Sequence, residues 1–271
     1  MDKLDKHELY QNSVQDVKKE TEFFKKTYRL LFNKQAKTFR EDFCGTGALS
    51  CEWVKNNVQC NAVGIDIDTE TLEWGIKNNV EFLNSDSDRV KLINHNVLVE
   101  YPEIEKFDVI CSLNYSHFLL TKRKDILQYF KNVFRNLSKD SIFIIDFYGG
   151  SHIHSDHSHV NYKSSGNSKF ISEQVNILNS QQNCSLNFKV SKNKYMPFFK
   201  YTFRTYSIIE LTELLEEVGF NKFKMYIKEF VEDDEEDEYT EYQEIEEGQD
   251  SYFPESDRYN GFIFASVDKS K

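Results

Sequence analysis

Residues 38–147 alternate short apolar runs with helical stretches, and this alternation constrains the fold more than any other feature. The apolar runs are nearly continuous, and the stretches between them repeat apolar residues at helical spacing. Strands separated by helices pair in parallel, and a sheet whose strands are apolar throughout is covered on both faces. The expected strands are 38–43, 62–67, 90–94, 107–113 and 141–147, and the expected helices are 48–56, 69–83 and 121–137.

The rest of the chain departs from this rhythm. Residues 1–36 show helical spacing, with Asn12-Ser13 as a possible interruption and cap, so we expect a helical cover before the first strand. Residues 148–203 are polar with short alternating runs, which predicts an inserted antiparallel or lid element. A helix between Ser207 and Gly219 and strands at 222–230 and 260–267 predict an antiparallel close. The main domain is therefore expected at 37–147 and 204–271.

The formal net charge of −11 belongs to one segment. Residues 231–247 hold 11 acids and no Lys or Arg, so the other 254 residues are formally neutral (−11 minus −11). We expect an acidic loop at 231–258, either solvated or, over 232–247, docking a basic protein partner. Broad nucleic-acid binding is not expected, because it requires a basic face.

The five cysteines, at positions 44, 51, 60, 111 and 184, are odd in number and form no CxxC pair. This pattern is typical of reduced, mostly buried thiols. The first residues lack the apolar core of a signal peptide, and no run approaches 18 apolar residues. We expect a soluble, cytoplasmic protein that does not bind membranes.

A glycine turn follows the first expected strand. Glu41 ends the strand, Cys44-Gly45-Thr46-Gly47 forms the turn, and a helix begins at Ala48. Small residues let a ligand approach the backbone, and a strand, glycine turn and helix N-terminus hold nucleotide-like cofactors in α/β sheets. The short motif also occurs in ordinary turns that connect secondary-structure elements and bind no ligand.

Polar residues follow three further strands. Asp66 comes 25 residues after Glu41 and suits the hydroxyls of a ribose. Asn96-Val97 follows the third strand and could read an adenine edge, and Asn114-Tyr115 follows the fourth, where an acceptor would lie. Ligands of open α/β sheets bind along the edge that these strand ends share.

The series FREDFCGTG, GIDID, INHNVL, FDVICSLNYS and IFIIDF, with the antiparallel close, resembles the class I S-adenosylmethionine-dependent methyltransferases. The likeness covers residues 38–147 and 204–268. It is similar above all to a largely uncharacterised group of small methyltransferases with an ELY-x-x-SVQ-like opening, here 8–10 and 13–15, and a REDFCGT turn, here 40–46. The resemblance implies a Rossmann-like fold and S-adenosylmethionine as cofactor.

The resemblance also implies roles for single residues. Glu41 would face the methionine end of the cofactor, with Gly45 and Gly47 close to it. Asp66 would bind the ribose, and Ile67, Asn96 and Val97 would meet the adenine. Asn114 would begin the acceptor side. The full set of cofactor-binding candidates is Tyr10, Arg40, Glu41, Cys44, Gly45, Thr46, Gly47, Asp66, Ile67, Asn96, Val97 and Asn114.

Two residues depart from the family pattern. Phe43 stands where the first glycine of acid-x-Gly-x-Gly would be, and it narrows the approach to the cofactor. Asn96 replaces the usual acid of the adenine motif, and its amide can donate as well as accept. A dinucleotide oxidoreductase is the competing interpretation of the strand ends. Ser50 at the position of the third glycine of GxGxxG weighs against it.

Methyl transfer is a single in-line displacement, for which the protein holds a nucleophile, excludes water and sometimes removes a proton. Asn114, Tyr115 and His117 are the catalytic candidates, although His117 could equally be a packing histidine. Further pocket walls are expected from Tyr10, Gln15, Tyr148, Arg204 and Tyr206. Asn114 is not followed by Pro-Pro, so the NPPY-like signature of amino-methylating nucleic-acid enzymes is absent.

The run HIHSDHSH at 152–159 matches the H-x-H-x-D-H metal motif of metallo-β-lactamase-like hydrolases. That fold needs further histidines downstream, and the chain has none after His159. We therefore expect a polar loop and no metal in the active site.

Taken together, the sequence predicts an S-adenosylmethionine-dependent methyltransferase acting on an unidentified small molecule. Two alternatives stay open: a non-catalytic binding protein of the same fold, and a protein methyltransferase that docks a basic partner on residues 232–247.

Overall fold

The computed structural model describes most of the chain: residues 5–55, 57–101, 106–150, 153, 156–161, 169–178, 180–191, 194–229, 242–245 and 258–267. Within these residues no helix combines the length and the apolar character needed to cross a membrane.

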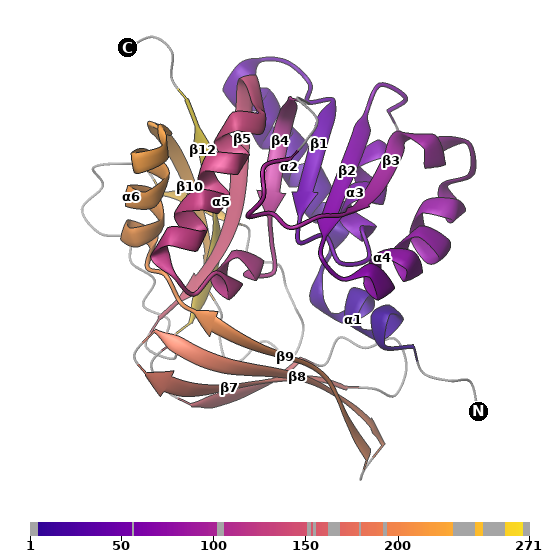
Figure 1. Cartoon of the computed structure of the whole chain (residues 1–271), viewed down its shortest axis with the longest axis vertical. Coiled ribbons are helices and arrows are strands. Elements are labelled where there is room, and N and C mark those ends of the chain that lie inside the picture. Colours follow the sequence, from indigo (N-terminus) through magenta and orange to yellow (C-terminus); the bar gives the residue numbers. More distant parts are fainter. Residues whose placement is uncertain are drawn as a thin grey trace.

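An eight-stranded sheet carries the main domain (Figure 1). Its strands are β1 (Thr38–Asp42), β2 (Asn61–Asp66), β3 (Val90–Asn94), β4 (Phe107–Ser112), β5 (Leu137–Gly149), β10 (Lys222–Glu229), β11 (Gln243–Ile245) and β12 (Tyr259–Ser266). Their order is β3-β2-β1-β4-β5-β12-β10-β11. The first five are parallel, so their carboxyl ends share one edge, whereas β12 runs antiparallel to both β5 and β10. The predicted parallel sheet with an antiparallel close is confirmed.

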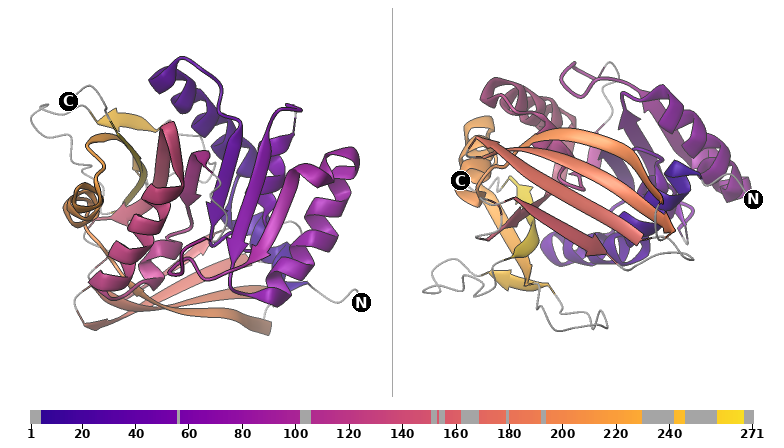
Figure 2. Two further views of the ribbon diagram at one scale, coloured as in Figure 1. Left: turned by 45° about the horizontal axis from the view of Figure 1, so that its top comes forward. Right: turned by 90° about the horizontal axis from the view of Figure 1, so that it is seen from below.

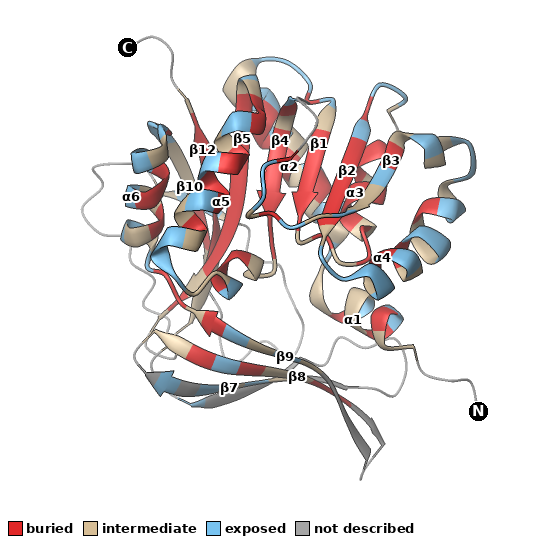
Figure 3. Cartoon of the chain, viewed as in Figure 1, coloured by how far each residue is buried: buried red, intermediate tan, exposed pale blue. Residues whose placement is uncertain are grey.

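Helices cover both faces of this sheet (Figure 2). They are α1 (Lys6–Val14), α2 (Val17–Phe32), α3 (Ala48–Val54), α4 (Thr69–Gly75), α5 (Arg123–Asn136) and α6 (Ile208–Val218). One core lies between the sheet and α5 with α6, and the other lies between the sheet and α2 with α3. The strands between them are buried along most of their length (Figure 3), which explains their continuous apolar sequence.

A second, four-stranded antiparallel sheet lies across the carboxyl edge of the parallel strands (Figure 1). It consists of β6 (His157–Asn161), β7 (Lys169–Leu178), β8 (Gln181–Ser191) and β9 (Lys194–Arg204), in that order. The hydroxyl of Tyr148 donates to Gln182 Oε1 at 3.0 Å, which ties the end of β5 to β8. The expected antiparallel insertion is thus a sheet that covers the carboxyl edge of the parallel strands.

Several boundaries differ from the sequence prediction. Asp16, not Ser13, caps α2, and Asp68 caps α4, because each carboxylate accepts a backbone N–H of the first helical turn. The helix expected to reach residue 83 changes at Ile76 to a π-helical turn and then to a 3₁₀ helix (Glu81–Arg89). Part of the acidic segment forms the edge strand β11. Ser207 caps α6 and forms a capping box with Glu210.

All five cysteines are free and buried, as expected. His157 and His159 belong to β6, while His152 and His154 fall outside the part of the chain that is described. Among the described residues no group of His, Cys, Asp and Glu is arranged to hold a metal ion.

Candidate active site

The glycine turn leaves β1 through a left-handed backbone. Phe43, Gly45 and Gly47 have φ values of +56°, +53° and +67°. A Cβ on Gly47 would come within 2.5 Å of Leu92, whereas a Cβ on Gly45 would meet only Thr71, at 3.9 Å. The turn therefore packs tightly against the domain at Gly47 and stays open on the outer side of Gly45, where a ligand can approach the backbone.

Phe43 takes the positive φ that the family's glycine would supply. Left-handed backbone costs a non-glycine residue about 1–2 kcal/mol. The half-buried ring packs edge-on against Tyr129 of α5, with 5.5 Å between ring centroids. The side chain thus packs against the α5 side of the sheet.

Asp66 closes the turn from the end of β2. Its carboxylate accepts the N–H of Gly45 at 2.8 Å and that of Asp68 at 2.9 Å. Asp66 is half-buried, and the neighbouring Ile67 is an exposed apolar side chain (68%). An acid beside an exposed apolar residue matches the ribose and adenine contacts expected at this strand end.

Glu41 lies on the α3 side of β1 and is buried. Its Oε2 accepts from the backbone N–H and the hydroxyl of Ser50, at 3.0 and 2.6 Å. Burial raises the pKa of Glu41 to about 7, with Asp66 and Asp42 adding to the effect and the Ser50 hydrogen bonds opposing it. Glu41 is thus fixed to the start of α3.

Arg40 faces the opposite side of β1. Its guanidinium forms two hydrogen bonds with Asp42, at 2.7 and 3.0 Å, and Asp42 also accepts from the hydroxyl of Tyr129. Both partners of this ion pair are almost fully buried. Arg40 therefore lies in the core beside α5, away from Glu41 and Ser50, and we leave it out of the proposed site.

The remaining turn residues and the third strand end point in different directions. Cys44 is buried against Gly64, so its thiol faces the sheet. Asn96 is exposed, and its amide oxygen accepts the N–H of Leu98 at 2.9 Å. Val97 is buried, and its carbonyl accepts from Asn132 of α5. Of this group, only Asn96 presents a polar side chain outward.

Asn114 and Tyr115, which follow β4, both have a left-handed backbone, with φ values of +55° and +58°. The carboxylate of Asp146 on β5 accepts the N–H of Tyr115 at 3.0 and 3.2 Å. Burial raises the pKa of Asp146 to about 7, while the backbone bonds from Tyr115 and Asn114 oppose that shift. Asp146 thus holds the acceptor-side turn, a role that the sequence analysis missed although IFIIDF places an acid near a strand end.

His117 is fully buried. Its Nδ1 lies 3.5 Å from the hydroxyl of Ser112, and its Nε2 has no hydrogen-bond partner among the described residues. Burial lowers the pKa of His117 to about 3, so the ring is neutral. The structure therefore buries His117 against Ser112 of β4 and the ring of Phe118.

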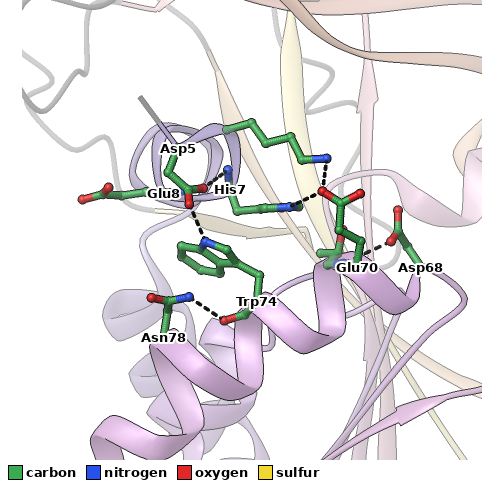
Figure 4. Close-up of polar contacts among 9 residues, drawn as sticks. Asp5, His7, Glu8, Asp68, Glu70, Trp74 and Asn78 are labelled. Atoms are coloured by element: carbon green, nitrogen blue, oxygen red, sulfur yellow. Dashed lines mark hydrogen bonds and ion pairs between the residues drawn. The ribbon is translucent and has the colours of Figure 1, made fainter. Parts of the chain in front are cut away.

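The first helix covers the glycine turn. Gln11 Oε1 accepts from the hydroxyl of Thr46 at 2.7 Å and from the amide of Asn79 at 2.9 Å. Asn79 also donates to the carbonyl of Thr46. Figure 4 shows a second set of contacts between α1 and α4, in which Asp5 accepts from the indole of Trp74 at 2.7 Å and Lys6 pairs with Glu70 at 2.8 Å. These contacts fix α1 to the glycine turn.

Aromatic side chains from the second sheet complete the enclosure. Phe199, Tyr201 and Phe203 alternate along β9 and stack in a row, and Tyr10 of α1 packs edge-on against Phe199 at 5.2 Å. Tyr10 is near enough to Asp66 for that carboxylate to contribute to the raised pKa of its phenol, after burial and Tyr201. These rings face the carboxyl edge of the parallel sheet.

Other expected pocket walls divide into two groups. Tyr148 packs edge-on against Tyr115 at 4.6 Å and so borders the turn after β4, and Gln15 donates to Glu20 of α2 at 2.8 Å. Tyr206 is buried with its hydroxyl on the carbonyl of Leu120, and the Arg204 guanidinium lies over its ring at 4.5 Å. The first pair stays within the proposed site, and the second supports the loop before α6.

Residues 44–143 match a family model described as a methyltransferase domain. The chain contains a methyltransferase domain. The sheet order β3-β2-β1-β4-β5-β12-β10 gives that domain the class I architecture, and its cofactor is S-adenosylmethionine.

Solved structures share this architecture at low sequence identity. An S-adenosylmethionine-dependent methyltransferase from Clostridium acetobutylicum is 17% identical over 92% of each chain, with a TM-score of 0.64. The sugar N-methyltransferase KedS8 from a Streptoalloteichus species is 12% identical over 96% of this chain and 91% of that one, with a TM-score of 0.62. The amino pentose methyltransferase CalS10 from Micromonospora echinaspora is 9% identical over 95% and 94%, with a TM-score of 0.65. A search among curated protein sequences found no match.

The residues of the methyltransferase domain fit this cofactor. The outer side of Gly45 is open, Asp66 and Ile67 sit together at the end of β2, and the buried Glu41 carries no basic partner in its hydrogen bonds with described residues. S-adenosylmethionine has a ribose, an adenine, and two positive charges on its methionine end. A ribose acid, an exposed apolar contact and an uncompensated carboxylate match these groups in kind.

Proposed function

We propose that this methyltransferase acts on a small molecule bound between the carboxyl edge of the parallel sheet and the second sheet. The observation that carries the proposal is the enclosure of that edge by α1 and by the aromatic row of β9. An edge covered by a helix and by a row of aromatic rings suits a small acceptor better than a folded protein or a nucleic acid. Two solved relatives of the fold, KedS8 and CalS10, bear names of sugar and amino pentose methyltransferases, which agrees with this size of acceptor.

In this proposal the cofactor lies along the ends of β1 and β2. Asp66 binds the ribose hydroxyls, Ile67 and Asn96 meet the adenine, and the backbone at Gly45 passes the methionine end, with Glu41 behind it. Thr46 and Tyr10 contribute from the turn and from α1. The cofactor, when bound, supplies an activated methyl group, and the protein contributes position and water exclusion.

The acceptor side is formed by the turn after β4. Asn114 and Tyr115 are held in a strained backbone by Asp146, so their positions are fixed before any ligand arrives. Tyr115 and Tyr148 would line the acceptor. His117 is buried beneath them and neutral, and we assign it a positioning role on the Ser112 side of the turn.

The docking of a basic protein on residues 232–247 has no support from the described residues, of which only 242–245 fall in that segment. The protein-methyltransferase alternative is therefore set aside in favour of a small acceptor.

Isothermal calorimetry tests the proposed site. S-adenosylhomocysteine and S-adenosylmethionine should each bind with one site per chain, and Ile67→Asp should weaken both by introducing a charge at the adenine contact. A folded protein that binds neither compound would refute the enzyme assignment. Binding without methyl transfer to any small molecule of a cell extract, with transfer to its proteins instead, would refute the acceptor size.

A further inference from the structure

Helix α1 lies between the glycine turn and the second sheet and contacts both. Building on the proposed function, we propose that α1 couples the two halves of the active site, so that a cofactor bound at the glycine turn fixes the aromatic row of β9 and prepares the acceptor side. The cofactor then binds before the acceptor, and each raises the affinity for the other.

One side of α1 is attached to the glycine turn. Gln11 accepts from the hydroxyl of Thr46 at 2.7 Å, and its side-chain amide pairs with that of Asn79 through two hydrogen bonds, at 2.9 and 3.3 Å. Asn79 donates in turn to the carbonyl of Thr46 at 2.9 Å. A Cβ on Gly75 of α4 would come within 2.3 Å of that carbonyl, so α4 already supports the turn. Gln11 therefore attaches α1 to a turn whose position is otherwise set.

The other side of α1 packs on the second sheet. Leu9 lies about 200° around the helix from Gln11 and is buried against Phe188 of β8. Leu9 and Phe188 form a small hydrophobic cluster, separate from the two cores of the main domain. The ring of Tyr10 reaches β9, where it packs edge-on against Phe199 with 5.2 Å between centroids. Movement of α1 would therefore disturb this small cluster and leave both main cores intact.

The docked position of α1 is weakly held. With 9 residues, α1 is shorter than the roughly 12–15 residues that an isolated helix needs in water. At its first turn the indole of Trp74 donates to Asp5 at 2.7 Å, which favours docking (Figure 4). The Lys6–Glu70 ion pair is largely exposed and contributes little. The buried Nε2 of His7 has no hydrogen-bond partner among the described residues, which opposes docking. The docked and undocked positions therefore differ little in free energy.

A bound cofactor shifts this balance. In the proposed function, Thr46 and Tyr10 contribute to the cofactor site from the turn and from α1. A ligand held between them contacts both only while α1 is docked, so its binding favours the docked position. Docked α1 holds Tyr10 against Phe199, the first ring of a row in which Tyr201 and Phe203 follow at centroid distances of 6.2 and 5.6 Å. The acceptor wall thus responds to a cofactor that lies on the ends of β1 and β2.

Hydrogen exchange with S-adenosylhomocysteine as the probe measures this coupling without a known acceptor. Exchange rates at 199–203 would be compared with and without saturating S-adenosylhomocysteine in the wild type, in Gln11→Ala and in the control Asn12→Ala, whose side chain is exposed on the same helix. The ratio of the two rates within each protein is the readout, because a general loss of stability in a variant affects both rates alike. Residues 44–47 report cofactor occupancy in the same experiment.

We expect S-adenosylhomocysteine to slow exchange at 199–203 by about tenfold in the wild type and in Asn12→Ala, but by less than about twofold in Gln11→Ala. The slowing at 44–47 should remain in all three proteins. Leu9→Ala, which removes the contact with the second sheet and keeps Gln11, should also lose the effect at 199–203.

Slowing at 199–203 that persists in Gln11→Ala or in Leu9→Ala overturns the coupling. It is also overturned if the wild type slows at 44–47 but not at 199–203, or if Asn12→Ala behaves like Gln11→Ala. Failure of the proposed function looks different, since S-adenosylhomocysteine would then slow exchange at neither segment of the wild type.

Discussion

The carboxylate of Asp66 accepts the backbone N–H of Gly45 at 2.8 Å, which joins the end of β2 to the turn after β1. The residue expected to bind the ribose is therefore also the residue that shapes the glycine turn. Its second oxygen holds the N–H of Asp68, the cap of α4. One side chain thus positions both segments that border the proposed cofactor, and its replacement tests both roles at once.

Replacing Asp66 separates these roles. Asp66→Ala removes the ribose contact and the acceptor for Gly45, and it should weaken binding of S-adenosylhomocysteine by a few kcal/mol at most, as expected for hydrogen bonds to a charged group. Asp66→Asn keeps one oxygen, which can still accept from Gly45 but not also from Asp68, so it should lower the Tm less than Asp66→Ala does while affinity still falls. Calorimetry and thermal unfolding measure the two effects, and unchanged affinity in Asp66→Ala would remove Asp66 from the cofactor site.

Phe43 offers a direct test of backbone strain. At its φ of +56°, Phe43→Gly should be more stable than Phe43→Ala by about 1 kcal/mol, because glycine adopts left-handed backbone without the penalty that any Cβ incurs. Both variants lose the ring contact with Tyr129, so that loss cancels between them. Urea unfolding monitored by circular dichroism gives the difference. Equal stability of the two variants would mean that the turn relaxes out of the left-handed region.

Gln11 tests the attachment of α1. Gln11→Ala removes the acceptor that links Thr46 and Asn79, so α1 should open more often and S-adenosylhomocysteine should dissociate several-fold faster. Hydrogen exchange of residues 6–14 and stopped-flow dissociation would follow the two processes. Asn12→Ala, on an exposed position of the same helix, is the control. Identical dissociation rates in both variants would show that α1 does not limit ligand release.

Stability should depend on pH in two opposite ways. Glu20, Glu41 and Asp146 have folded-state pKa values of about 8, 7 and 7, above their ordinary values of 4.5, 4.5 and 3.8, so the folded protein holds their protons longer and loses stability as pH rises through that range. His117 has a folded-state pKa of about 3, below its ordinary 6.5, so stability also falls as pH drops from 6.5 towards 3.

The three raised carboxyl pKa values outweigh the single lowered one of His117 between about pH 5 and 8, so the Tm should fall over that range and be highest at about pH 4. Glu20→Gln should flatten the alkaline side, because its side chain no longer ionises, while Glu22→Gln should leave the profile unchanged. Thermal unfolding at half-unit steps between about pH 3 and 9 measures the fall in Tm on both sides of the maximum. A Tm that climbs steadily from pH 6 to 8 in the wild type would contradict the raised carboxyl pKa values.

The sequence predicted those features of the site that a local sequence pattern reveals. The order of apolar strands and helices indicated the parallel sheet, and the position of Asp66 at a strand end was enough to place it beside the glycine turn. The same logic applies to Asp146, whose acid also stands near a strand end, yet without a glycine turn beside it nothing marked it as part of the site.

Arg40 shows a different limit. Strand alternation places Arg40 and Glu41 on opposite faces of β1, so the two could not both face α3. The hydrogen bond from Tyr129 of α5 to Asp42 shows which face of β1 lies against α5. Tyr129 lies 87 residues further along the chain than Asp42, so the local sequence does not reveal this contact.

The sequence by itself determined the parallel sheet, the glycine turn and the series of polar residues at the strand ends, because periodicity and turn chemistry are local. Only the tertiary structure decided that α1 and the second sheet cover the same edge. Contacts such as Gln11 with Thr46 and Tyr148 with Gln182 join segments more than 30 residues apart. They form only when distant segments pack together, so a short stretch of sequence does not predict them.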